Sequence, residues 1–146
     1  MAKHSFLLTA DWNGGRNSVG TIDAGNLKTK VSIPPEMDGP GVGTNPDEML
    51  LGAAGTCYII TLAAMLERAS ISVSSLTLES EGIVEVVSGI ITYKEIIHRP
   101  NIRLTNEAHE KKALILAEKA EKNCMISRAL AGNVEIKLET FIQTDE

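Results

Sequence analysis

The first third of the chain alternates between short apolar runs and turn residues. Ser5 to Trp12 is rich in apolar residues, Ser18 to Ala24 forms a second run, and Leu27 to Ile33 alternates between apolar and polar positions. The turn Asn13-Gly14-Gly15 separates the first two runs. Because runs of this kind bounded by turn residues favour strands, we predict a small antiparallel meander of three strands.

A helix is predicted to begin directly after Asn45. Asn45 can cap the helix, and Pro46 at the first helical position has no N–H to leave unpaired. Asp47 and Glu48 place two carboxylates at the positive end of the helix dipole, and Glu48 stands at the acidic position of a capping box. We expect this helix to run to about Ala69.

The helix contains eighteen uncharged residues from Met49 to Leu66, the minimum length for a membrane span. Gly52 and Gly55 lie inside this stretch, and Glu67 and Arg68 follow it directly. We therefore expect no membrane insertion and predict a helix that is buried on all sides. Since a lone chain of 146 residues could hardly cover such a helix, we predict a homodimer in which the two helices share a core.

Strand patterns return after the helix. Ser74 to Val87 and Ile90 to Leu104 are joined at Ser88-Gly89, which predicts a long β-hairpin.

A second helix is predicted from Glu107 to Asn123. Ala113, Ala117 and Ala120, followed by Cys124, fall on a single face, so Cys124 ends a buried stripe.

The end of the chain predicts a short helix and a strand. Met125 to Ala131 is a short helical turn with Ser127 as a cap, and Val134 to Thr140 alternates as one half-buried last strand. The order βββ-α-ββ-α-α-β predicts an α+β fold with mostly antiparallel sheets around two long helices. The length fits a single domain over residues 1–146.

Composition and charge exclude several function classes. Aromatic residues make up 3% of the chain, and 14 Lys and Arg stand against 19 Asp and Glu for a net charge of −5, so we expect no nucleic-acid partner. The N-terminus carries no apolar signal-peptide core, which predicts a cytoplasmic protein. His4, His98 and His109 lack the spacing of metal ligands, and we expect no metal site.

The two cysteines are the remaining candidates for chemistry. Cys57 lies near the middle of the long helix, and Cys124 follows 67 positions later. A cysteine in an apolar helix is usually an inert small hydrophobe, and a reactive thiol needs a cation nearby. Arg16, in the turn Gly14-Gly15-Arg16, could supply that cation, so both interpretations stay open at this point.

Two sequence motifs resemble a known family. Gly43-Thr44-Asn45-Pro46-Asp47-Glu48, followed by small and apolar residues up to Cys57, is the first, and Cys124-Met125-Ile126-Ser127-Arg128-Ala129-Leu130 is the second. Together they are similar to the two cysteine motifs of the OsmC/Ohr family, the osmotically induced and organic hydroperoxide resistance proteins. The resemblance implies an OsmC-like fold, an intertwined homodimer with sites at the subunit interface, and a peroxidase that reduces organic hydroperoxides.

The resemblance also implies roles for individual residues. Cys57 matches the peroxidatic cysteine, Cys124 the resolving cysteine that forms a disulfide with it in each turnover, and Arg16 the arginine that holds the thiolate. Asp47 stands where the family usually has a glutamate that pairs with this arginine, and Met125 stands where it commonly has proline.

The position of Asp47 raises a geometric question. Asp47 precedes Cys57 by ten residues, about 15 Å along an unbroken helix, which is too far for both to touch one arginine. Either the helix breaks near Gly52 and Gly55, or the acid comes from the other subunit.

Two functions stay open. The favoured one is a thiol peroxidase with an aliphatic pocket lined by residues such as Met49, Leu50 and Ile60. It needs no bound cofactor but an external reductant, for which the resemblance suggests a lipoyl dithiol or a small thiol. The alternative is a stress-induced protein of the same fold without enzymatic activity, which binds apolar ligands or senses redox state.

Overall fold

The computed structural model describes residues 1–146, and the chain divides into two compact units, Met1–Met49 and Leu50–Glu146. Each unit is described by itself. That the whole chain forms one domain stays a prediction.

The first unit contains the predicted meander. Strands β1 (Thr9–Asp11), β2 (Gly20–Ala24) and β3 (Leu27–Val31) form an antiparallel sheet in the order β1-β2-β3. The prediction is confirmed, but β1 is shorter than the apolar run that starts at Ser5. A short 3₁₀ helix, η1 (Pro35–Met37), follows in the loop after the sheet.

Helix α1 (Pro46–Arg68) begins as its sequence predicts. The backbone N–H of Glu48 donates to Oδ1 of Asn45 over 2.9 Å, which makes Asn45 the cap. The Glu48 carboxylate accepts a hydrogen bond of 2.9 Å from the Thr44 hydroxyl. The helix is continuous from Pro46 to Arg68, which excludes the first of the two alternatives, a break near Gly52 and Gly55.

Within one chain, α1 is buried on one face only, and burial of its other faces in a homodimer stays a prediction. The buried residues follow helical spacing: Ala54, Gly55, Tyr58, Leu62 and Leu66. Ile60, on another face, is 67% exposed. By length and composition alone α1 could span a membrane, since an 18-residue stretch of it has a mean hydropathy of 1.9. Within the chain, 22% of that stretch is buried.

Strands β4 (Val73–Val87) and β5 (Ile90–Leu104) form the predicted long hairpin. Its turn residues Ser88 and Gly89 both have positive φ, 51° and 78°, as a type I′ turn requires.

The end of the chain differs from the prediction of a single last strand. It forms two strands, β6 (Glu135–Leu138) and β7 (Phe141–Thr144), and both pair with β5 in parallel. The interruption between them lies opposite Pro100, which has no N–H to donate to a neighbouring strand. This second sheet is therefore mixed, while most strand pairing in the chain is antiparallel, as the sequence predicts.

The second predicted helix is a 3₁₀ turn, η2 (Glu107–His109), that leads into α2 (Glu110–Asn123). Its predicted inner face is confirmed: Ala113, Ala117, Ala120 and Cys124 are fully buried. Helix α3 (Met125–Leu130) follows with Cys124 at its N-cap position. Ser127 is a buried residue inside α3, so its predicted role as a cap is wrong.

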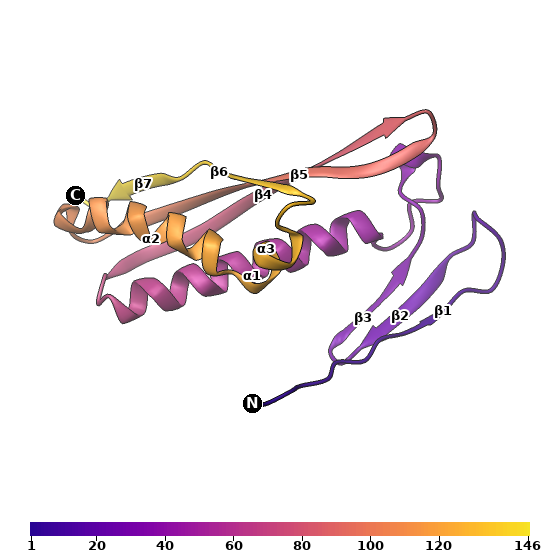
Figure 1. Ribbon diagram of the computed structural model, residues 1–146, viewed down its shortest axis with the longest axis horizontal. Coiled ribbons are helices and arrows are strands. Elements are labelled where there is room, and N and C mark those ends of the chain that lie inside the picture. Colours follow the sequence, from indigo (N-terminus) through magenta and orange to yellow (C-terminus); the bar gives the residue numbers. More distant parts are fainter. The chain divides into compact units, whose positions relative to one another are not determined.

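The main core of the second unit lies between the helices and the hairpin. Figure 1 shows α1 and α2 along the same face of β4 and β5. The core joins residues of all three kinds of element: Tyr58, Leu62, Leu66, Ile71, Ile102, Leu104, Ala113, Leu116, Ala117 and Ala120. This packing places the middle of α1 beside the end of α2.

Candidate active site

The structure brings the two cysteines together. Cys57 is half-buried in the middle of α1, and Cys124 is buried between the end of α2 and the start of α3. Both are free thiols, and the two side chains are within hydrogen-bonding reach of each other. Two residues that are 67 positions apart in the sequence therefore form one dithiol site.

The environment of Cys57 favours its thiolate. Burial raises the pKa of Cys57, but hydrogen bonds from the Cys124 thiol and from the backbone N–H groups of Ile126 and Met125 lower it, and the net pKa is below its ordinary value. These N–H groups are free to do so because the first N–H groups of a helix have no partner inside it. The first turn of α3 thus stabilises negative charge on Cys57.

The environment of Cys124 has the opposite effect. Burial and the hydrogen bond with Cys57 raise the pKa of Cys124, although groups of Ser127 and Ile126 act against them. Cys57 therefore loses its proton before Cys124 does. This asymmetry divides the two thiols into a nucleophile and a proton-bearing partner.

Thr61 is a site residue that the sequence reasoning missed. Its hydroxyl donates to the carbonyl of Cys57 over 2.7 Å and also helps to lower the pKa of Cys57. Since Thr61 follows Cys57 by four positions on a helix, its spacing alone could have pointed to it. The backbone donors at Met125 and Ile126 left no such signal, because every residue except proline carries the same N–H group.

Arg16 and Asp47 belong to the first unit, whereas both cysteines belong to the second. The Arg16 guanidinium donates to the carbonyls of Met37 and Asp38 over 2.6 and 3.2 Å. Asp47 lies in the first turn of α1. The pairing of Arg16 with the Cys57 thiolate and with Asp47 stays a prediction.

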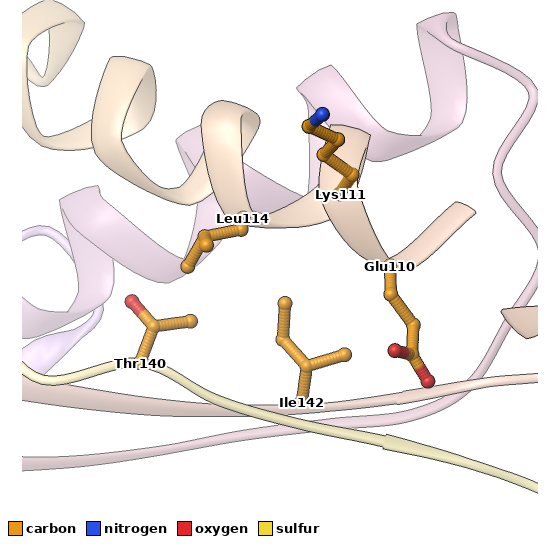
Figure 2. A pocket seen from close by; sticks show the side chains of 5 residues that line it. All are labelled: Glu110, Lys111, Leu114, Thr140 and Ile142. Atoms are coloured by element: carbon orange, nitrogen blue, oxygen red, sulfur yellow. The ribbon is translucent and has the colours of Figure 1, made fainter. Parts of the chain in front are cut away.

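An open cavity of about 410 Å³ lies elsewhere in the second unit, beside the first turns of α2. It is lined by Glu110, Lys111, Leu114, Thr140 and Ile142. Figure 2 shows Leu114, Thr140 and Ile142 pointing toward one another between the helix and the last strand. None of the predicted site residues lines it, and the expected aliphatic pocket at Met49, Leu50 and Ile60 stays a prediction.

The structure contains no group of three or more His, Cys, Asp or Glu residues arranged to hold a metal ion.

Residues 39–139 match the profile of the OsmC-like protein family, and this stretch includes both cysteines. The chain belongs to the OsmC-like family. It is 59% identical to YmaD of Bacillus subtilis (strain 168), described as an uncharacterized protein, over 98% of this chain and 97% of that protein.

More distant OsmC-like relatives carry functional names. The organic hydroperoxide resistance protein OhrB of the same Bacillus strain is 28% identical, over 95% of this chain and 98% of that protein. A Legionella pneumophila crystal structure is described as an organic hydroperoxide resistance protein OsmC, a predicted redox protein and regulator of sulfide bond formation. It matches with a TM-score of 0.80 at 25% identity, covering 97% of this chain and 99% of that one. The OsmC-like α+β fold is thereby established for this chain.

Proposed function

We propose that this OsmC-like protein is a cysteine-based peroxidase that reduces organic hydroperoxides to alcohols in oxidative stress defence. The observation that carries the proposal is the dithiol pair in which the pKa of Cys57 is lowered and that of Cys124 is raised. The name organic hydroperoxide resistance protein, which the relative OhrB carries, supports the choice of substrate.

The first step uses the Cys57 thiolate as the nucleophile. Its sulfur attacks the outer oxygen of the hydroperoxide, the O–O bond breaks, and the alkoxide takes a proton to leave as an alcohol. Cys57 is oxidised to sulfenic acid. The N–H groups of Met125 and Ile126 lower the pKa of Cys57 and so favour the thiolate that attacks the hydroperoxide.

The second step uses Cys124. Its sulfur attacks the Cys57 sulfenic acid, an S–S bond forms, and the hydroxyl of the sulfenic acid leaves with the Cys124 proton as water. Because the two side chains already lie within hydrogen-bonding reach, this step needs little rearrangement. An external dithiol, of the lipoyl type, then reduces the disulfide by thiol exchange in the cytoplasm.

The proposal includes a homodimer in which Arg16 and Asp47 complete the site. Since α1 is continuous, Asp47 lies about 15 Å along the helix from Cys57 of its own chain. The remaining alternative is an acid supplied by the second subunit. The exposed apolar faces of α1, which include Ile60, are available for contact with a second copy.

A peroxidase assay tests the proposal. Cumene hydroperoxide consumption is followed with dihydrolipoamide, dithiothreitol or glutathione as reductant. Wild type should turn over many equivalents with a dithiol, and Cys57→Ser should consume none because a serine hydroxyl is not ionised at neutral pH. Thr56→Ser, a conservative change at an exposed neighbouring position, is the matched control and should keep wild-type activity.

Wild type that retains an apolar ligand but consumes no hydroperoxide with any reductant would contradict the peroxidase proposal. That outcome would favour a ligand-binding protein of the same fold.

A further inference from the structure

A polar cluster in the core lies against Tyr58, the residue that follows Cys57 on α1. His98 on β5 is fully buried, and a hydrogen bond of 2.6 Å joins its Nδ1 to Oγ of Ser80 on β4. Its Nε2 has no hydrogen-bond partner. A buried polar side chain left partly unsatisfied costs stability, so His98 indicates a role beyond filling space.

The partner of His98 on the helix side is Tyr58, the residue that follows Cys57. The two rings are stacked, with centroids 4.9 Å apart and planes inclined by 10°. Burial lowers the pKa of His98 to about 4, so the ring that meets Tyr58 is neutral at neutral pH. The sheet therefore presents a flat, uncharged surface to Tyr58.

The other end of Tyr58 is fixed to α2. Its hydroxyl donates to the carbonyl of Ala117 over 2.9 Å in the core. Burial, together with the charge of Glu121, raises the pKa of Tyr58, which keeps this hydroxyl protonated as a donor. Tyr58 thus connects α1 to the sheet on one side and to α2 on the other.

This connection lies where it can govern the two thiols. Ala117 precedes Cys124 by seven residues, two helical turns along the same face of α2. On the sheet side, α1 approaches Ser80 so closely that a Cβ on Gly55 would lie 3.3 Å from its Oγ. A change in how Tyr58 sits would alter the spacing of α1 and α2 beside the cysteines.

We propose that Tyr58 is a positioning residue whose hydroxyl, held by Ala117 while its ring rests on His98, sets the helix spacing at which Cys57 meets Cys124. The inference rests on the proposed function, because the spacing matters when the two thiols react with each other. A disulfide tolerates only a narrow range of separations between its two cysteines, so a small shift of α1 slows its formation.

The test uses Tyr58→Phe, which removes only the hydroxyl. Diamide, a thiol oxidant, drives formation of the Cys57–Cys124 disulfide without any peroxide. The expected rate falls about two- to tenfold, the range that corresponds to one net hydrogen bond. Alkylation of Cys57 by iodoacetamide, followed by peptide mass spectrometry, should also shift to higher pH, because the donors around the thiolate are less well aligned.

Ile96→Val is the matched control. It removes one methyl group from a fully buried side chain of β5 in the other core cluster. It should lower Tm to a similar extent but leave the disulfide rate and the alkylation profile unchanged. His98→Leu removes the ring on which Tyr58 stacks. This variant should also slow disulfide formation, as Tyr58→Phe does, and it provides a second test.

Two results would overturn the proposal. One is a rate of disulfide formation in both Tyr58→Phe and His98→Leu within experimental error of wild type, and the other is an equal slowing in Ile96→Val. Peroxide consumption by wild type is measured in parallel. A wild type that forms the disulfide with diamide but consumes no hydroperoxide contradicts the proposed function alone, since the diamide and alkylation readouts do not depend on peroxide.

Discussion

At the scale of single residues, the proposed chemistry depends on a difference between two thiols in contact. Cys57 is half-buried and receives hydrogen bonds from the backbone of Met125 and Ile126, which lower its pKa, whereas burial raises the pKa of Cys124. The donors from Met125 and Ile126 are main-chain groups, so their effect depends on the position of α3 more than on side-chain identity. A substitution by proline is the exception, because proline has no backbone N–H group to donate to Cys57.

Met125→Pro tests this dependence. Proline suits the first position of a helix, and Cys124 already has the extended backbone, with ψ of 127°, that a residue before proline prefers. The variant should fold but lose one donor to the thiolate, which raises the pKa of Cys57. We expect alkylation of Cys57 at neutral pH to slow about two- to tenfold, while Met125→Leu, which keeps the N–H group, matches wild type. Superimposable pH profiles for the two variants would exclude a role for this donor.

His98 predicts a pH-dependent stability. Burial lowers its pKa from 6.5 to about 4 in the folded chain, so between these values the unfolded chain takes up a proton that the folded chain does not. Above pH 6.5 His98 is neutral in both states, and its pKa shift does not affect the free energy of unfolding. Below pH 6.5 the free energy of unfolding falls as the pH drops, by about 3 kcal/mol at pH 4. Urea unfolding at several pH values compares wild type with His98→Gln. The prediction fails if both lose the same stability between pH 7 and pH 4.

The site could be predicted from the sequence only in part. The pairing of Cys57 with Cys124 came from a resemblance between motifs, because neither the spacing of 67 residues nor the apolar pattern indicates contact. The pattern alone favoured an inert thiol at Cys57. The roles of Tyr58 and His98 were not predicted, since stacking across a core depends on how the helix and the sheet pack.

At the scale of elements, local signals predicted most boundaries. The start of α1 at Pro46 and the hairpin turn at Ser88-Gly89 both follow from the few residues that form them. The split between β6 and β7 was missed because alternation continues across it, and its cause lies opposite, at Pro100 of β5. A strand break that is caused by a residue of the neighbouring strand can be predicted only once the strand pairing is known.

The cap of α1 gives a prediction at this scale. Asn45→Ala removes the acceptor of the Glu48 N–H group and leaves that donor without its partner. We expect a loss of about 1 kcal/mol in the free energy of unfolding, measured by urea titration. Asn45→Ser, which keeps a capping oxygen, should lose much less. If the two variants are equally stable, the cap contributes nothing.

At the scale of the whole molecule, α1 leaves apolar side chains exposed to solvent. One face is buried within the chain, but Ile60 remains 67% exposed in the uncharged stretch from Met49 to Leu66. An apolar surface of this kind on a helix of a folded protein favours association. In the proposed homodimer, the same surface of a second copy packs against it.

Light scattering tests the homodimer. Wild type at micromolar concentration should have twice the 15.7 kDa mass of one chain. Ile60→Glu should shift the protein toward the monomer, because a carboxylate there would be buried without a partner. Leu114→Glu, at an exposed position of α2, is the control and should remain dimeric. A wild-type particle of 15.7 kDa would contradict the dimer.

Intact mass spectrometry after a short pulse of organic hydroperoxide tests the central claim most directly. Wild type should lose the mass of two hydrogens as the Cys57–Cys124 disulfide forms. Cys124→Ser should instead gain one oxygen at Cys57 and, in excess hydroperoxide, proceed to sulfinic and sulfonic acid. Cys57→Ser should keep its mass. A wild-type protein that stays fully reduced under excess organic hydroperoxide would contradict the account.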